Sequence, residues 1–160
     1  MNWDEYLMGF ARHASLKSKD PSTKVGAAIV APDHGLICTG FNGFPSGVLE
    51  TPERWERPEK YNWVVHAELN AILHAAKHGK KLDGSTLYST LLPCDRCAMH
   101  IHQVGIKKVV IDHYEWIKYS QANQEGVKSG FSRSIQALHE ARIPLLFLGL
   151  DGTLLAAYTL

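Results

Sequence analysis

The chain has 160 residues, close to the common size of one domain, and we expect a single domain over residues 1–160 with one sizeable core. Its formal net charge is +1, from 17 basic and 16 acidic residues, which argues against a protein that holds nucleic acid by charge alone. A small anionic nucleotide is still compatible with this balance, because it needs only one or two local donors.

Cysteine usage and the N-terminus indicate where the protein works. The chain has three cysteines, and Cys38, inside an apolar run, is expected to be a buried core thiol. The N-terminus carries acids where a signal peptide has an apolar core, and we find no stretch long and apolar enough to span a membrane. We therefore expect a cytoplasmic protein without a membrane partner.

Helical and strand patterns alternate along the chain. Apolar residues at helical spacing predict an opening helix from Trp3 to Ala14, and a turn near Pro32 joins two strands into a hairpin. Residues 42–62 are expected to be a long polar loop. The remaining expected elements are a helix from His66 to near Gly79, a strand over 86–90, a helix from Cys94 to about Val104, a strand over 108–112, a helix that includes Ile135, Leu138 and Ala141, a strand over 145–148 and a short edge strand within 153–159.

This order predicts a three-layer α/β/α fold with a mixed five-stranded sheet, which starts as a hairpin and continues through parallel βαβ units. In such sheets the functional site lies at the strand ends where helices begin. The helices that follow His66 and Pro93 are both expected to begin there.

The most specific motif is His66-Ala67-Glu68 followed by Pro93-Cys94-Asp95-Arg96-Cys97. Cys94 and Cys97 are three residues apart, so on one helix they share a face and can both reach a single tetrahedral ion. His66 supplies a third ligand from another helix start. Three ligands leave a fourth position open for water, and zinc lowers the pKa of a water molecule bound there. The sequence therefore predicts one catalytic zinc ion held by His66, Cys94 and Cys97.

Glu68 lies two residues after His66 and is not needed as a ligand. We expect it to be the catalytic residue that moves protons between water and substrate. The pattern H-x-E…P-C-x-x-C is typical of zinc-dependent nucleobase deaminases. The competing interpretation, a structural or redox pair of cysteines, leaves His66 and Glu68 without a role.

Longer segments around the motif resemble the deoxycytidylate (dCMP) deaminase family of the cytidine deaminase superfamily. The resemblance covers about residues 3–112 and, more loosely, the helix near 134–142. Its matching segments are S-K-D-P-S-T-K-V-G-A at 18–27, G-F-N-G-F-P-S-G at 40–47, H-A-E-L-N-A-I at 66–72, T-L-L-P-C at 90–94 and Q-V-G-I-K-K-V-V at 103–110.

The resemblance implies a cytidine-deaminase-like fold and hydrolysis of dCMP to dUMP and ammonia. It also implies that Asn42 binds the sugar hydroxyl of a small-molecule nucleotide, and Lys19 is our candidate for phosphate contact. Family members are often homohexamers, so the resemblance implies a homo-oligomer. Some members carry a second, structural zinc, but residues 42–65 contain neither Cys nor His and do not support one.

Several alternatives stay open. The same zinc chemistry fits a deaminase of dCTP, of 5-substituted dCMP, of guanine or of tRNA adenosine, and the non-enzyme alternative is a zinc-stabilised binding module. Tyr114, Trp116 and Tyr119 follow the strand over 108–112, where they either form an aromatic wall for the base or pack between that loop and the last helix. The extra histidines near the motif (His74, His78, His100 and His102) are expected not to bind the metal.

Overall fold

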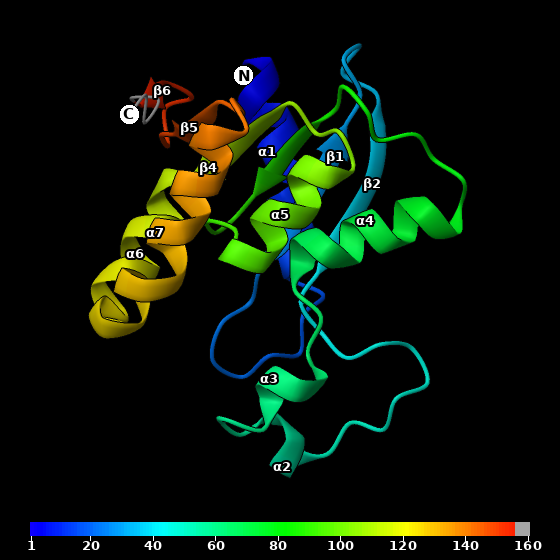
Figure 1. Ribbon diagram of the computed structural model, residues 1–160, viewed down its shortest axis with the longest axis vertical. Coiled ribbons are helices and arrows are strands. Elements are labelled where there is room, and N and C mark those ends of the chain that lie inside the picture. The colour runs from blue at the N-terminus through cyan, green and yellow to red at the C-terminus, as the bar shows by residue number, and fades with distance from the viewer. Residues whose placement is uncertain (156–160) are drawn as a thin grey trace.

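A computed structural model describes residues 1–155, except for the side chains of residues 124–129. Its centre is one six-stranded sheet in the order β2-β1-β3-β4-β5-β6 (Figure 1). The strands are β1 (Gly26–Val30), β2 (Leu36–Phe41), β3 (Thr86–Ser89), β4 (Lys108–Asp112), β5 (Leu145–Leu148) and β6 (Leu154–Leu155).

The sheet is mixed, as predicted from the element order. β1 pairs antiparallel with both β2 and β3, and the series β3, β4 and β5 is parallel. The sheet has six strands where five were expected, because the two-residue β6 adds an antiparallel edge beside β5. This edge falls in the tail where a short strand was anticipated, and the rest of that expected strand, residues 156–159, lies outside the described residues.

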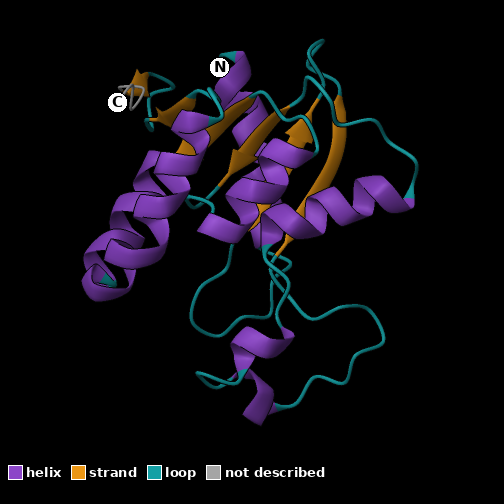
Figure 2. Cartoon of the chain, viewed as in Figure 1, coloured by secondary structure: helices purple, strands orange, loops and turns teal. Residues whose placement is uncertain are grey.

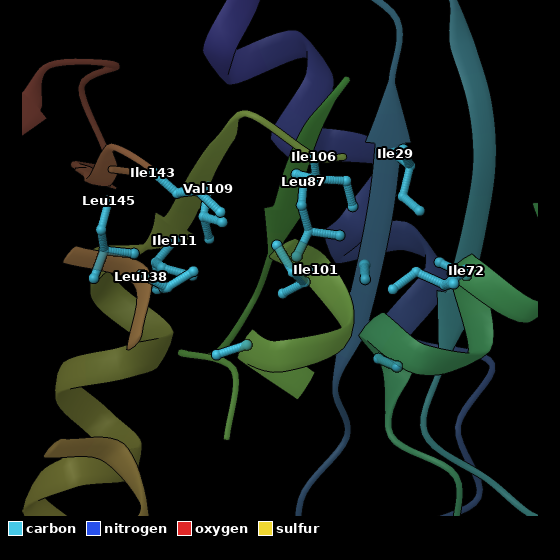
Figure 3. Close-up of a cluster of buried hydrophobic side chains, with 14 of the residues drawn as sticks. Ile29, Ile72, Leu87, Ile101, Ile106, Val109, Ile111, Leu138, Ile143 and Leu145 are labelled. Carbon is cyan, nitrogen blue, oxygen red and sulfur yellow. The ribbon is translucent and has the colours of Figure 1, made fainter. Parts of the chain in front are cut away.

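Helices cover both faces of the sheet and complete the α/β/α layers (Figure 2). Successive side chains of β1 point to opposite faces of the sheet. Ala28 and Val30 pack with the apolar side of α1, while Ala27 and Ile29 face the opposite layer. α1 (Trp3–Ser15) covers the first face, and α4 (Ala67–Lys77), α5 (Asp95–Gln103) and α7 (Gln124–Glu140) cover the second. Figure 3 shows the larger core on this second face, where Ile29, Leu87 and Ile101 meet.

Glycines allow two helices to lie directly on the hairpin. A Cβ atom at Gly40 in β2 would overlap the carbonyl oxygen of Ala67 and the amide nitrogen of Ala71 in α4. A Cβ atom at Gly26 in β1 would overlap the backbone of α1 in the same way. Because glycine has no side chain, position 40 lets the first turns of α4, where His66 and Glu68 lie, pack directly on β2.

The segment expected to be a long polar loop contains two short helices, α2 (Pro52–Trp55) and α3 (Lys60–Trp63). Its ends are joined by paired backbone hydrogen bonds between Gly43 and Val65, of 3.1 Å and 2.9 Å. Figure 1 shows this segment projecting beyond the end of the sheet. One turn is too short to give an apolar period, so only local capping, such as Thr51 before Pro52, marks these helices in the sequence.

Residues after β4 also differ from the expected loop, because they form helix α6 (His113–Ala122). Asp112 caps it by accepting hydrogen bonds from the backbone N–H groups of Tyr114 and Glu115. No residue of α6 is buried, so its apolar residues do not form the stripe by which helices are recognised.

Candidate metal centre and cavity

The three predicted metal ligands meet at the N-terminal ends of two neighbouring helices. His66 is the N-cap residue of α4, and Cys94 is the N-cap residue of α5. Cys97 lies one turn into α5 and is buried. The spacing of the motif and the two helix starts thus bring one imidazole and two thiols together, as the sequence predicts.

The geometry of this cluster suits a zinc ion. Nδ1 of His66 lies 3.4 Å from Sγ of Cys94 and 3.6 Å from Sγ of Cys97. Two ligands of a tetrahedral zinc, with Zn–S near 2.3 Å and Zn–N near 2.0–2.1 Å, are separated by roughly 3.6 Å. The three ligand atoms lie within 4.8 Å of one another, and within the described residues they are the only group with this arrangement.

The three side chains of the cluster shift one another's pKa values. Hydrogen bonds with Cys97 and with His66 together lower the pKa of the Cys94 thiol to about 4, although burial acts in the opposite direction. The helix N-terminus favours the same thiolate. The contact with Cys94 raises the pKa of His66 to about 9. The contact with Cys94 and burial raise the pKa of Cys97, because two neighbouring thiolates repel each other unless a cation lies between them.

Glu68 lies in the first turn of α4 and is 3% exposed. Burial raises the pKa of its carboxyl above the ordinary value of 4.5, although the charge of His66 acts against this shift. A raised pKa makes a carboxylate a stronger base, which favours its taking a proton from a neighbouring group. Glu68 lines the same cavity as His66 and Cys94.

The cluster opens into a cavity of about 160 Å³. Its walls come from the segment after α1, from the projecting segment between β2 and α4 that contains α2 and α3, from the starts of α4 and α5, and from the pair α6 and α7. The residues that line it are Asp20, Thr23, Val25, Asn42, Arg57, Lys60, Tyr61, Val64, His66, Ala67, Glu68, Leu91, Leu92, Cys94, Tyr119 and Phe131.

Asn42 lines this cavity, but its side chain is already extensively hydrogen-bonded. Its Oδ1 accepts from the backbone N–H of Val25 at 2.8 Å. Its Nδ2 donates to Oδ2 of Asp20 at 3.1 Å and to the carbonyl oxygen of Thr23 at 2.9 Å. Asn42 thus fixes the loop before β1 and leaves a second lone pair of Oδ1 for another donor.

Lys19 is not brought into the cavity. Its side chain is 73% exposed and pairs with Glu50, with 3.1 Å between Nζ and Oε1. The cavity wall instead carries Arg57 and Lys60, two cations that the sequence analysis did not assign. Both come from the projecting segment, whose fold over the metal centre depends on contacts with distant residues. The only sequence signal for Arg57 and Lys60 as cavity residues is that both lie in a long polar loop, which is often functional.

The aromatic residues after β4 divide between the two expected roles. Tyr119 lines the cavity with Phe131, whereas Trp116 packs against Phe131 with 5.1 Å between ring centroids. Tyr114 is 52% exposed and does not line the cavity. The aromatic part of the cavity wall is thus formed by Tyr119 of α6 and Phe131 of α7, and Phe131 had no role in the sequence analysis.

This arrangement defines a class of protein. A three-layer fold that places one histidine, two cysteines and a buried glutamate at two helix starts is typical of zinc-dependent hydrolytic deaminases. Residues 1–113 match the model of the cytidine and deoxycytidylate deaminase zinc-binding region, and the chain belongs to this family.

Individual relatives agree with the family. The chain is 39% identical over 121 residues to a probable deoxycytidylate deaminase of Drosophila melanogaster, covering 69% of this chain and 59% of that protein. It is 40% identical over 116 residues to the deoxycytidylate deaminase of Mus musculus, covering 69% and 64% respectively. It therefore spans less than two thirds of the length of these curated relatives.

A solved structure matches over a larger share of the chain. The dCMP deaminase of the cyanophage S-TIM5, in complex with dCMP and dUMP, matches with a TM-score of 0.70 and 28% identity. The match covers 90% of this chain and 95% of that one. No helix in the described part of this chain is long and apolar enough to cross a membrane.

Proposed function

We propose that the protein catalyses the zinc-dependent hydrolysis of dCMP to dUMP and ammonia. The observation that carries the proposal is that the buried Glu68 lines the same cavity as His66 and Cys94, two of the three clustered candidate metal ligands. The choice of dCMP is supported by the deoxycytidylate deaminases among its relatives and by the similar structure with dCMP and dUMP bound.

In this proposal His66, Cys94 and Cys97 hold one zinc ion. An ion held there would lower the pKa of a water molecule enough for it to act as a nucleophile at neutral pH. Glu68 would take a proton from the attacking water and deliver it to N3 of the cytosine ring. Oxygen adds to C4, the bond between C4 and the amino nitrogen breaks, and Glu68 passes a proton to the leaving group. The balance is dCMP plus water to dUMP plus ammonia.

Asn42 is proposed to contact the sugar. Its Nδ2 group is engaged by Asp20 and Thr23, so a sugar hydroxyl would donate to the second lone pair of Oδ1. The phosphate contact assigned to Lys19 stays a prediction, and it requires the lysine to leave Glu50. Assembly into a homo-oligomer, with a hexamer as the form that the resemblance implies, also stays a proposal that sedimentation analysis can test.

Glu68→Gln tests the mechanism. The amide cannot carry a proton, so we expect turnover of dCMP to fall by about 10²–10⁴-fold. Zinc content and the thermal midpoint should stay close to those of the parent, because the amide is nearly isosteric with the acid. Glu56→Gln, at an exposed carboxylate outside the cavity wall, is the matched control. Near-normal turnover by Glu68→Gln would contradict the proton-carrying role.

The substrate is tested by an ultraviolet deamination assay over dCMP, CMP, deoxycytidine, dCTP, 5-methyl-dCMP, guanine and adenosine. We expect the highest kcat/KM with dCMP. A strong preference for guanine or for dCTP would contradict the proposed substrate and retain the zinc chemistry. Bound zinc without turnover of any of these compounds would favour the zinc-stabilised binding module.

A further inference from the structure

A nucleoside monophosphate carries a dianionic group outside the base and sugar, so a specific site needs a cation near its mouth. Two cationic side chains, Arg57 and Lys60, line the catalytic cavity. They lie three residues apart in the projecting segment but differ in burial and in the partners that they contact.

Lys60 is committed to the protein itself. Its side chain is 8% exposed, and its Nζ donates to Oδ2 of Asp20 at 2.8 Å and to Oγ of Ser22 at 3.0 Å. A buried ammonium paired with a buried carboxylate is electrically balanced, and removing it from that partner leaves the carboxylate uncompensated. Lys60 thus joins the projecting segment to the loop before β1 and is a poor candidate for binding a ligand anion.

Arg57 has the opposite character. It is exposed, lines the cavity, and forms no ion pair or side-chain hydrogen bond with any part of the chain that the structure describes. The neighbouring Arg54 shows the contrast, because its guanidinium lies 3.7 Å from the ring centre of Trp63 and donates to the carbonyl oxygen of Leu49 at 2.7 Å. Arg57 is therefore a cation at the cavity whose hydrogen-bond donors are available.

Arg57 lines one cavity together with the aromatic residue Tyr119 and with Glu68. Burial raises the pKa of Tyr119, although the charge of Arg57 acts to lower it. Glu68 and the metal ligands lie on the wall formed by α4 and α5. A base held beside Glu68 can therefore direct its 5′-phosphate towards the segment that carries Arg57.

We infer that Arg57 binds the 5′-phosphate of the substrate and gives the enzyme its preference for a nucleoside monophosphate over the free nucleoside. The inference rests on the proposed deamination of dCMP and assigns the residue that selects this substrate. A guanidinium can bind two phosphate oxygens at once, which matches a terminal phosphate better than the single ammonium of a lysine.

The test compares ligands with and without the phosphate. For Arg57→Ala we expect kcat/KM for dCMP to fall by about 10- to 100-fold, mainly through KM, since a charged hydrogen-bonding partner is lost. The loss with deoxycytidine should be much smaller. Calorimetry provides a readout that is independent of turnover, in which dUMP binding weakens by the same factor and deoxyuridine binding does not. Arg57→Lys should give an intermediate loss.

Matched variants separate Arg57 from the other cations near the site. Arg54→Ala removes a neighbouring guanidinium that is already engaged, and Lys19→Ala removes the cation that the sequence suggests. Lys24→Ala removes a cation from a second cavity of about 530 Å³, which also contains Arg12 and Lys118 and shares Thr23, Leu91 and Tyr119 with the first. Arg54→Ala and Lys24→Ala should keep the parent ratio of kcat/KM between dCMP and deoxycytidine, and Lys19→Ala tests the competing assignment of the phosphate contact.

The outcomes are distinct. An unchanged ratio in Arg57→Ala, or loss of the phosphate preference in Lys19→Ala or Lys24→Ala instead, would overturn the role of Arg57 and leave the deamination of dCMP in place. An equal loss of deoxyuridine binding would show a general disturbance of the cavity and would also overturn it. Failure of the parent enzyme to deaminate dCMP would overturn the proposed function, and the inference with it.

Discussion

At the scale of single residues, Asp20 organises the cavity without a proposed part in the chemistry. Its carboxylate accepts hydrogen bonds from Lys60, from the amide of Asn42, and from the backbone N–H groups of Ser22 and Thr23. Burial acts to raise the pKa of Asp20, but the hydrogen bonds from Lys60, Ser22 and Thr23 outweigh it and lower the pKa below the ordinary 3.8. Two proposed substrate contacts, Asn42 and the segment that carries Arg57, are thus held by one carboxylate.

Asp20→Asn is expected to destabilise the protein by about 3–5 kcal/mol, because it leaves the buried ammonium of Lys60 without its charged partner. Chemical denaturation at neutral pH measures this. Glu50→Gln breaks the exposed pair with Lys19 and should change the free energy of unfolding by less than about 1 kcal/mol. Equal losses in the free energy of unfolding would contradict the prediction that the buried pair stabilises the fold more than the exposed pair.

The same pair predicts a pH dependence. Because the pKa of Asp20 is lower in the folded than in the unfolded state, its stabilisation is complete above the unfolded value, near 3.8. It is lost as the pH falls through the folded value, where both states bind the proton. The stability difference between the parent and Asp20→Asn should therefore be constant near neutral pH and narrow below about pH 4. A difference that grows in acid would contradict this sign.

At the scale of elements, the position of α4 depends on Gly40. Gly40→Ala would force its Cβ against the backbone of Ala67 and Ala71, which belong to the first turns of α4. We expect a destabilisation of about 1–3 kcal/mol from overpacking. We also expect kcat for dCMP to fall by about 10²-fold, since small displacements of His66 and Glu68 misplace the reacting groups. Denaturation and steady-state kinetics measure the two effects.

Gly9→Ala is the matched control for this prediction. Gly9 lies within α1, and a Cβ atom there would meet nothing within 4 Å. Alanine should therefore stabilise the helix by about 0.5–1 kcal/mol and leave kcat unchanged. If Gly40→Ala also kept its stability and its kcat, the close contact between β2 and α4 would not set the position of His66 and Glu68.

Elements that bury an apolar face could be predicted from the sequence, whereas the helices that bury no apolar face were missed. The strand Lys108–Asp112 was predicted with its observed limits, because four of its five residues are buried. Helix α6 was described as a loop because none of its residues is buried, although Asp112 followed by Glu115 three positions later is a recognisable start signal. Helices α2 and α3 are single turns whose place depends on distant partners, such as Asp20 for Lys60.

At the scale of the whole molecule, the chemistry of the site was more predictable than its specificity. His66, Glu68, Cys94 and Cys97 are placed by short spacings at two helix starts, so local sequence is sufficient to bring them together. Arg57, Lys60 and Phe131 reach the cavity only because the projecting segment and α7 close around it. Their positions follow from tertiary packing, for which no short motif exists.

The metal centre should also stabilise the whole fold, since it joins α4 to α5 across 28 residues of chain from His66 to Cys94. A ligand that binds only the folded state, at 100 times its Kd, adds about 2.7 kcal/mol, which corresponds to roughly 5–10 °C in the thermal midpoint of a chain of this size. Removing zinc with a chelator should lower the midpoint by this amount, and adding zinc back should restore it. Calorimetry combined with metal analysis measures both.

Cys97→Ala tests whether the chelator lowers the thermal midpoint by removing the ion that His66, Cys94 and Cys97 hold together. The variant loses one of three ligands, so it should purify with little zinc and should unfold at a temperature that the chelator no longer changes. Cys38→Ala is the matched control, because its thiol is also partly buried but lies outside the metal cluster. It should keep one zinc ion per chain and the full response to the chelator. A parent protein that loses its zinc without a change in thermal midpoint would show that the metal serves catalysis alone, and that packing of α4 and α5 against the sheet is sufficient to hold the site together.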